Sequence, residues 1–346
     1  MSGVPAPAIP LDDLAAALER EFGLEVREPR ALDGEHDRNL RFRDAAGALH
    51  VAKWSAASMA DAVAWQEALL RHVEDAPLDF AVPRLRPTRA GERSARIPTA
   101  EGDAIVRVLS WVDGALLAEA PPPREPLLRS IGRASARLTL ALADLRTELS
   151  PPRHHWLVED SLASFDAAAA AIDDRLEPAM RARLGAVRAA FAEIAPSIPE
   201  LPRGVVHQDL HDENLLIAEP GHDRVAGVID FNDAFDTALV ADLAVAGAYG
   251  MLRQDDPLAA LARMARGYEE LRPLGAGERR ALPRMAAMRL AINWATWAQR
   301  GAAEGAEYAA GRTRFTRPAL ELLVDPALAD GGLGAAFRRF EDELGG

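Results

Sequence analysis

Residues 207–214, with the sequence HQDLHDEN, gather acidic, amide and imidazole side chains in one short stretch. The stretch follows the apolar pair at 205–206 and precedes the apolar run at 215–217, so it is predicted to be a loop between two short strands. Its spacing, H-x-D-L-x-x-x-N, is typical of phosphoryl-transfer catalytic loops, in which the aspartate takes the proton of the attacking hydroxyl and the asparagine holds magnesium. We therefore predict that Asp209 is a catalytic base and that Asn214 is a magnesium ligand.

A second carboxylate follows where the same chemistry needs one. The apolar residues Val228 and Ile229 lead into Asp230 and Phe231, and phosphoryl-transfer enzymes place their second metal-binding carboxylate in such a sequence. Magnesium prefers oxygen ligands and keeps several waters, so one carboxylate, one amide oxygen and the phosphates of a nucleotide suffice. The transition state is loose and negatively charged, so the protein mainly positions groups and supplies positive charge. Asp230 is therefore the second predicted magnesium ligand.

Two other interpretations of the loop stay open from the residues alone. Aspartate and asparagine both favour turns, so Asp209 and Asn214 could be ordinary turn formers. His207, Asp209, His211 and Asp212 alternate within six residues and could belong to the metal cluster of a hydrolase. Such a cluster normally needs further histidines downstream, and the only later one, His222, lies in a predicted turn between two strands. The phosphoryl-transfer interpretation is therefore favoured.

The elements before this loop are predicted to form a small sheet. An amphipathic helix that ends at Gly23 is expected first, and then strands at 24–32, 39–43 and 49–54, the last two joined by a hairpin turn. Lys53 ends a Val-Ala-Lys sequence similar to the V-A-I-K strand of protein kinases, whose lysine contacts the nucleotide phosphates. A lysine in a strand more often lies on a solvated face or guards an edge. Its position, one hairpin into an N-terminal lobe, favours nucleotide binding.

A helix is expected to follow, with Ser58 as its N-cap and its end near Val73. Glu67 lies centrally in this helix and is the predicted partner that orients Lys53. Asp61 is the alternative partner, although the helix dipole explains an acidic residue in the first turn.

Two further strands are expected at 81–88 and 104–112. The segment 109–114 is predicted to be a hinge whose backbone reads the purine edge of a nucleotide, with Trp111 as its cofactor-binding residue. A plain strand end followed by a turn is the alternative. Neither G-x-G-x-x-G nor G-x-x-x-x-G-K-[ST] occurs in the chain, so neither a dinucleotide fold nor a P-loop enzyme is supported.

The rest of the chain is predicted to be mostly helical. Helices are expected at 124–145, 157–175 and 178–194, and in about four segments after 240, with starts or stops at Pro257, Pro273, Pro283 and Pro318. Trp294 and Trp297, three positions apart, either pack between helices or form an aromatic wall that faces the substrate. Trp294 is therefore a candidate substrate residue.

Composition restricts the class of protein. The 346 residues are 49% hydrophobic, enough for about two domains with a sizeable core. The absence of cysteine excludes disulfides and fits a reducing compartment, so we expect a cytoplasmic protein, either a monomer or a homodimer. No secretory signal and no membrane-spanning run is visible. A net charge of −13 argues against nucleic-acid binding and is compatible with a cationic small substrate.

Taken together, these motifs give the chain a family resemblance. It resembles the aminoglycoside phosphotransferase and choline kinase-like superfamily, and within it the hydroxylysine kinase-like group. The motifs that carry the resemblance are GEHDRN at 34–39, VAK at 51–53, VHQDLHDEN at 206–214, VIDFND at 228–233 and ADLA at 241–244.

The resemblance implies an α+β, protein-kinase-like bilobal fold. Residues 1–112 would form a small nucleotide-binding lobe with an antiparallel sheet and one main helix. Residues 113–346 would form a larger, mostly helical lobe with the catalytic loop and the acceptor site. It also implies magnesium, ATP or GTP as the phosphoryl donor, and an acceptor hydroxyl on a small amine, amino acid or sugar-like molecule.

The chain departs from the family pattern at two positions. Gln208 replaces a glycine common in antibiotic-modifying relatives, which is tolerable if the backbone there is not left-handed. Asn232 replaces the glycine of Asp-Phe-Gly, and asparagine tolerates a positive φ, so that turn can survive. His207 and Asp242 are interpreted as structural residues that brace the loop.

These residues predict a small-molecule O-phosphotransferase. Asp233 and Asp236 follow Asp230, and two more carboxylates lie in the catalytic loop, so an acidic rim is predicted to favour an acceptor that carries an ammonium group. Asp233 and Asp236 are the candidate substrate residues; the alternative is that they cap the helix near Val240. The alternative functions are a catalytically silent nucleotide-binding module and a metal-dependent hydrolase.

Overall fold

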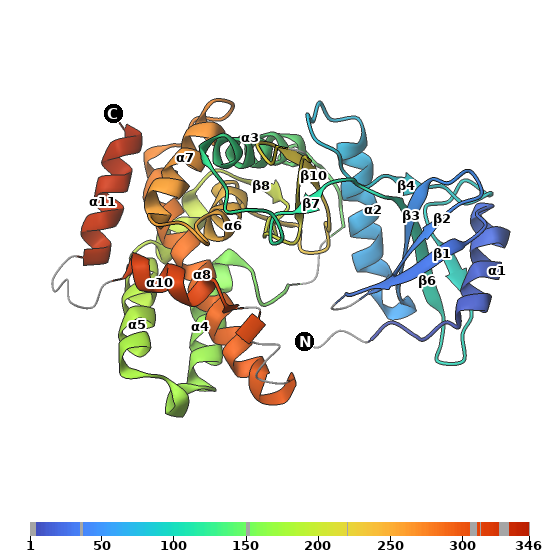
Figure 1. Ribbon diagram of the computed structural model, residues 1–346, viewed down its shortest axis with the longest axis horizontal. Helices are drawn as coiled ribbons and strands as arrows, with labels where there is room; N and C mark the ends of the chain where they lie inside the picture. Colours follow the sequence, from blue (N-terminus) through green and yellow to red (C-terminus); the bar gives the residue numbers. More distant parts are fainter. Residues whose placement is uncertain are drawn as a thin grey trace. The chain divides into compact units, whose positions relative to one another are not determined.

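The computed structural model describes residues 5–34, 37–149, 153–219, 221–304, 310–311, 313–324 and 332–345, with the side chains of 302–304 excepted (Figure 1). The chain forms two compact units. The N-terminal unit takes in the described residues of Met1–Ala76, Ala81–Asp113 and Arg146–Pro152, and the C-terminal unit those of Pro77–Phe80, Gly114–Leu145 and Arg153–Gly346. The first contains an antiparallel sheet and the second is mostly helical, which confirms the predicted α+β class.

The N-terminal sheet is antiparallel throughout and has the order β1-β2-β3-β6-β4, with β5 paired to β6. The strands are β1 (Arg27–Leu32), β2 (Arg38–Arg43), β3 (Leu49–Ala56), β4 (Leu85–Arg86), β5 (Ala95–Ile97) and β6 (Ala104–Ser110). The predicted hairpin turn between β2 and β3 is confirmed, since the N–H of Gly47 donates to the carbonyl of Asp44. The expected strand at 81–88 shortens to β4, because Pro83 and Pro87 have no N–H to donate.

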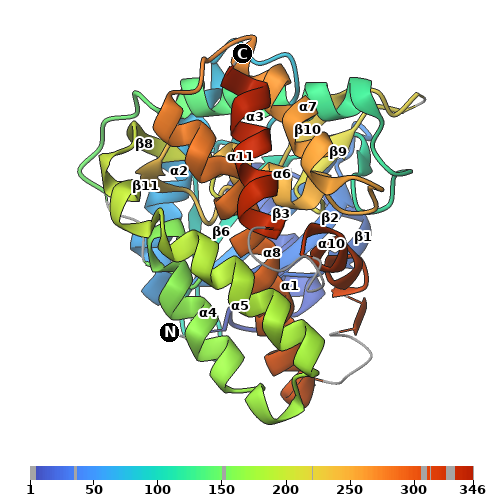
Figure 2. The ribbon, with the colours of Figure 1, turned by 90° about the vertical axis from the view of Figure 1, so that its left-hand side faces the viewer.

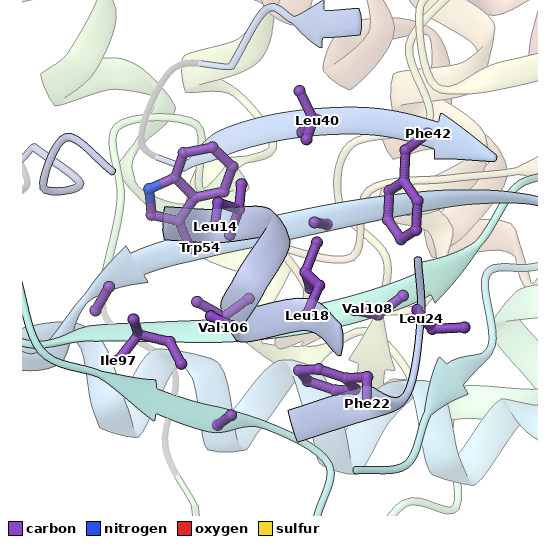
Figure 3. Packing of buried hydrophobic residues seen from close by; sticks show 14 of the residues in the cluster. Leu14, Leu18, Phe22, Leu24, Leu40, Phe42, Trp54, Ile97, Val106 and Val108 are labelled. Atoms are coloured by element: carbon purple, nitrogen blue, oxygen red, sulfur yellow. The ribbon is translucent and has the colours of Figure 1, made fainter. Parts of the chain in front are cut away.

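Two helices cover opposite faces of this sheet (Figures 1 and 3). Helix α1 (Leu11–Phe22) carries Leu14, Leu18 and Phe22 on one face because these positions are four residues apart. They pack against residues buried on one face of the strands: Leu40, Phe42, Ala52, Trp54, Val106 and Val108 (Figure 3). Side chains alternate along a strand, so Lys53 faces away from this core, toward α2 (Ala60–Glu74).

Helix α2 begins later than the sequence predicts. A 3₁₀ turn, η1 (Ala57–Met59), precedes it, and the N-cap is Met59, without a side-chain hydrogen bond. The prediction of Ser58 as N-cap is therefore wrong, because Ser58 lies inside the 3₁₀ turn.

The C-terminal unit is built around the long helix α8 (Ala276–Glu304), against which α4 (Ser161–Ala170), α5 (Pro178–Ala192) and α6 (Val240–Gly250) pack (Figure 2). The other helices are α3 (Glu125–Leu142), α7 (Pro257–Glu269), α10 (Thr316–Leu323) and α11 (Gly332–Gly345). The expected helix at 157–175 is shorter, because 3₁₀ turns flank α4 on both sides. Pro283 lies inside α8 and does not mark a helix boundary. A proline removes one backbone hydrogen bond of the helix, and the packing of neighbouring helices against α8 compensates for that loss.

Two small sheets carry the predicted catalytic segments. One has the order β10-β9-β7, formed by β7 (Ala115–Leu116), β9 (Leu215–Ile217) and β10 (Val225–Val228). The other pairs β8 (Arg203–Val206) with β11 (Phe235–Ala238). The loop 207–214 connects β8 to β9 and therefore passes from one small sheet to the other.

A buried carboxylate fixes the start of this loop. Asp242, in the first turn of α6, is fully buried, and it accepts the backbone N–H groups of His207 at 3.1 Å and Gln208 at 2.7 Å. The hydroxyl of Thr139 on α3 lies 3.5 Å from the same carboxylate. Burial raises the pKa of Asp242 to about 7, although the two N–H bonds oppose that shift. Asp242 thus braces the loop, as the sequence predicts.

The contact between α3 and α7 gives a first testable prediction. A Cβ atom on Gly132 of α3 would overlap the backbone oxygen of Met264, and one on Gly267 of α7 would overlap the backbone oxygen of Arg129. Overpacking typically costs about 1–3 kcal/mol. We expect Gly132→Ala and Gly267→Ala each to lower the free energy of unfolding by at least that amount, measured by urea denaturation.

The matched control is Gly185→Ala on α5, where an added Cβ meets nothing within 4 Å. Alanine is favoured over glycine in an exposed helix, so this variant should be more stable by about 0.5–1 kcal/mol. Equal effects at the three glycines would show that α3 and α7 do not approach this closely.

The brace at Asp242 gives a second prediction. Asp242→Ala leaves two buried N–H groups without an acceptor, and each unpaired group costs about 1–3 kcal/mol. We expect the free energy of unfolding to fall by about 2–5 kcal/mol, and Asp242→Asn, which keeps one acceptor oxygen, to recover part of the loss. The exposed Asp255→Ala should stay within about 0.5 kcal/mol of the parent. A loss at Asp242 no larger than at Asp255 would contradict the bracing role.

Candidate active site

The backbone is strained at two of the positions that the sequence singles out. Gln208 has φ of 66°, so the backbone there is left-handed and the condition for an unstrained glutamine at this position is not met. In the second motif the positive φ belongs to Asp230, at 61°, and not to Asn232. A left-handed conformation costs an L-residue about 1–2 kcal/mol, and such strain gathers at functional sites. At Gln208 the hydrogen bond from its N–H to Asp242 holds the strained conformation.

The two motif segments lie side by side. The N–H of Ile229 donates to the carbonyl of Asn214 at 3.0 Å, and Nε2 of His207 lies 3.1 Å from the carbonyl of Ile229. Burial lowers the pKa of His207 to about 4, so the ring is neutral at pH 7 and serves as a structural link. The loop residue Asn214 and the carboxylate of Asp230 therefore belong to neighbouring segments.

Asp209 is held by three side chains. Its Oδ1 accepts from Nη2 of Arg289 at 2.7 Å, and its Oδ2 accepts from Nδ2 of Asn214 at 2.9 Å and lies 3.3 Å from Nε2 of His211. Nδ2 of Asn214 also donates to the backbone oxygen of Asp209. The amide nitrogen of Asn214 is thus committed to Asp209, which leaves Oδ1 as the side-chain atom that can bind a metal ion.

Charge keeps Asp209 ionised. Burial opposes ionisation, but the neighbouring His211 and Arg289 cations hold the pKa of Asp209 well below its usual range. In the same pair, the charge of Asp209 raises the pKa of His211 well above its usual value despite burial, with a further contribution from Asp212. At neutral pH the site therefore contains an aspartate anion between two cations.

Sequence reasoning did not assign a catalytic role to His211 or Arg289. His211 lies inside the loop, and its alternation with His207 and Asp209 is a sequence signal that also fits a hydrolase metal cluster. Arg289 is separated from Asp209 by 80 positions, and no spacing rule connects them. Among the described residues no group of three or more His, Cys, Asp or Glu side chains is arranged to hold a metal ion, which disfavours the hydrolase interpretation.

The three candidate substrate residues occupy different surroundings. The backbone oxygen of Asp233 lies 3.1 Å from Nε2 of His154, and the charge of Asp233 helps to raise the pKa of Arg289. Asp236 lies in β11, is exposed, and pairs with Arg203 at 3.4 Å. The N-cap of α6 is Leu239, with no side-chain bond, so the helix-capping alternative for both aspartates is wrong.

Trp294 does not share the helix face of Arg289. Residues four and seven positions after Arg289, Asn293 and Thr296, lie on its face of α8. Nδ2 of Asn293 lies 3.3 Å from the hydroxyl of Tyr249, and Oγ1 of Thr296 lies 2.9 Å from Nε2 of His155. Trp294 is half-buried on another face of α8, and its role in substrate binding stays a prediction.

In the N-terminal unit, Lys53 pairs with a carboxylate that the sequence did not single out. Nζ of Lys53 lies 3.2 Å from Oδ2 of Asp37, and Nη2 of Arg107 lies 3.6 Å from the same oxygen. The other oxygen of Asp37, Oδ1, accepts a hydrogen bond from the hydroxyl of Ser55 at 2.5 Å. Burial opposes ionisation of Asp37, but the charges of Lys53 and Arg107 lower its pKa. The pairing follows from the sheet: Asn39 is opposite Lys53, so the chain before β2 passes beside the end of β3.

Glu67, the predicted partner of Lys53, is half-buried on α2. Its Oε1 has no hydrogen-bond partner within the part of the chain that the structure describes, while its neighbour Gln66 accepts a hydrogen bond from Arg107. Asp37 therefore holds Lys53 in this structure, and an orienting role for Glu67 stays a prediction. Asp37 belongs to the GEHDRN segment of the family resemblance, in which Glu35 and His36 lie outside the described residues.

Trp111 directly follows strand β6 of the N-terminal sheet. Its backbone N–H donates to the carbonyl of Leu49 at 3.2 Å, and its ring faces the guanidinium of Arg41 at 5.9 Å. Ser110 likewise donates its N–H to the carbonyl of Arg84. The N–H of Trp111 is therefore already occupied, and a hinge that reads a purine would have to use other backbone groups of the segment.

Comparisons with known proteins agree with this arrangement. The model of the phosphotransferase enzyme family matches residues 28–274. A homoserine kinase of Gluconacetobacter diazotrophicus is 35% identical over 162 residues, which are 45% of this chain and 47% of that protein. The hydroxylysine kinase of Danio rerio is 22% identical over 287 residues, 80% of each chain. The chain thus spans about half the length of the homoserine kinases that it matches.

A solved structure shows the same fold. The amicoumacin kinase hAmiN, solved with AMP-PNP and Ca²⁺, has a TM-score of 0.65 and 13% identity, and covers 97% of this chain and 93% of its own. Among the helices that the structure describes, none is both long and apolar enough to cross a membrane. The family model runs from β1 to the connection between α7 and α8 and includes both motif segments, so the chain belongs to the phosphotransferase enzyme family.

Proposed function

We propose that this protein transfers the terminal phosphoryl group of ATP or GTP to a hydroxyl group of a small acceptor that contains an amine, with hydroxylated amino acids as the leading class. The observation that carries the proposal is the ionised carboxylate of Asp209, held on a braced loop beside the segment of Asp230. The homoserine and hydroxylysine kinases are named for amino acids that bear a hydroxyl group, which supports this acceptor class.

The metal-binding atoms suit magnesium. Asn214 offers its amide oxygen because its nitrogen is bound to Asp209, and Asp230 offers a carboxylate on the neighbouring segment. An all-oxygen set of one amide and one carboxylate fits an ion that keeps several waters. When bound, magnesium would neutralise charge on the phosphates of the donor. The structural neighbour solved with AMP-PNP and Ca²⁺ supports a nucleotide and a divalent cation in this fold.

Each remaining residue has a distinct task in this proposal. Asp209 orients the acceptor hydroxyl and takes its proton. Lys53, aligned by Asp37, binds the phosphates of the donor. Residues 1–112 would supply nucleotide binding and residues 113–346 the acceptor site. A cytoplasmic location, and a monomeric or homodimeric state, stay predictions from composition.

The role of Asp209 gives a third prediction. Asp209→Asn keeps the shape of the side chain but removes the proton acceptor, so kcat should fall by about 10²–10⁴ while nucleotide affinity is kept. Turnover is measured as magnesium-dependent ADP formation with hydroxylated amino acids and amino alcohols. The exposed Asp223→Asn serves as the control and should keep parental kcat. If Asp209→Asn turns over at nearly the parental rate, Asp209 is not the base.

The metal site gives a fourth prediction. Because φ of Asp230 is positive, alanine there would add backbone strain, so Asp230→Gly is the cleaner removal of the carboxylate. We expect this variant to lose magnesium-dependent binding of a nucleotide analogue in calorimetry, because an amide and waters alone hold the ion poorly. Its free energy of unfolding should stay within about 1 kcal/mol of the parent. Unchanged magnesium-dependent binding, or stoichiometric zinc in purified protein, would contradict the assignment of Asp230 as a magnesium ligand.

A further inference from the structure

Arg289 is buried, and its guanidinium is only partly paired. Only 7% of its surface is exposed, and its guanidinium faces the ring of Trp156 at 4.4 Å. Nη2 donates to Oδ1 of Asp209. Nε and Nη1 are buried and have no hydrogen-bond partner among the described residues. Buried N–H groups are nearly always paired, because an unpaired one is costly.

Arg289 also lines a small cavity. Its volume is about 20 Å³, and its polar lining comes from Arg289, Gln208 and Ser161, beside the ring of Trp156. Oε1 of Gln208 is also buried without a partner in the described part of the chain. The cavity therefore has room for one group the size of an oxygen atom, with donors on one side and an acceptor on another.

The shape of a guanidinium allows it to hold two carboxylates. It has two binding edges, formed by Nε with Nη2 and by Nη1 with Nη2, and each matches the two oxygens of a carboxylate. Asp209 uses Nη2 alone, so each edge keeps one unpaired nitrogen. One edge is sufficient for Asp209, which leaves the other for an anionic group of a ligand. The flat face of Trp156 keeps the guanidinium in this orientation.

Negative charge lies beside this donor group. Burial opposes the charge of Arg289, but Tyr249, and after it Asp209 and Asp233, raise its pKa. Asp209 is in direct contact with the guanidinium. A ligand that brings an ammonium group to an aspartate and a carboxylate to Arg289 would satisfy both. In an α-amino acid, the ammonium group and the carboxylate are attached to the same carbon atom.

We propose that Arg289 binds the α-carboxylate of the acceptor and thereby selects hydroxylated α-amino acids over amino alcohols. The inference rests on the proposed function and narrows its acceptor class. Arg289 is a specificity-determining residue here, and its bond to Asp209 places the carboxylate of the acceptor at a fixed distance from the base. The acceptor hydroxyl and the α-carboxylate must then be separated by the span between Asp209 and the free edge of Arg289.

The experiment uses two matched pairs of acceptors. L-homoserine is compared with 3-aminopropan-1-ol, and 5-hydroxylysine with 1,5-diaminopentan-2-ol, so that each pair differs only in the carboxylate. We expect the parent enzyme to prefer the carboxylated member of at least one pair by about 10- to 100-fold in kcat/KM, the effect of a bidentate charge-assisted contact. Arg289→Gln should remove that preference, and Arg289→Lys, which keeps the charge without the fork, should retain part of it.

Loss of the bond to Asp209 lowers kcat for both members of a pair alike, so the ratio between members is the informative quantity. Arg263→Gln on α7, which removes an exposed contact with Glu125, is the control and should keep the parental ratio. A parental enzyme without preference for the carboxylate overturns the proposal. So does a ratio that is the same in Arg289→Gln and the parent, because Arg289 would then only position Asp209.

A binding measurement separates this proposal from the catalytic one. L-2-aminobutyrate has the carboxylate and ammonium of homoserine but no hydroxyl, and propylamine lacks the carboxylate as well. Calorimetry should show that the parent binds L-2-aminobutyrate more tightly than propylamine, and that Arg289→Gln abolishes the difference. If this difference in binding is found but no acceptor is turned over, the proposed kinase function is overturned and the role of Arg289 in ligand binding stands. Turnover of amino alcohols, with no preference for the carboxylated ligands, would overturn the role of Arg289 alone.

Discussion

The hydrogen bonds from two successive N–H groups to the carboxylate of Asp242 control the candidate active site. They hold the chain where it leaves β8, and they keep Gln208 in a left-handed conformation that the residue would not adopt alone. The next residue is Asp209, so the direction of its side chain is set by the turn at Gln208. The energy that fixes the catalytic loop therefore comes from a residue on α6, behind the site, that does not touch the reacting groups.

The same site shows how a half-buried carboxylate is kept charged. Asp209 lies between His211 and Arg289, and these cations lower its pKa, which also makes it a weak base. A weak base is adequate for the proposed reaction, because the phosphoryl-transfer transition state is loose and catalysis depends mostly on positioning and charge. The two cations therefore matter more for holding the carboxylate in place than for tuning its strength.

In the N-terminal unit, the sheet decides the partner of the lysine. Lys53 and Asp37 are neighbours because β2 and β3 are adjacent antiparallel strands, and Arg107 from β6 completes the group. Gln66 on α2 pairs with Arg107, and the next residue, Glu67, keeps a buried oxygen without a partner among the described residues. Which charged residues lie next to Lys53 is therefore decided by the order of the strands more than by the position of α2.

The sequence by itself determined the features that depend on local signals. The spacing of Asp209 and Asn214, the hairpin before Lys53 and the end of α1 at Gly23 follow from patterns within a few residues, and the structure contains them. Only the tertiary structure decided that Arg289 meets Asp209, that Asp37 holds Lys53, and that the positive φ lies at Asp230. These features depend on which distant segments pack together. No propensity or spacing rule connects residues that are 80 positions apart, since their contact is set by the packing of α8 against the rest of the unit.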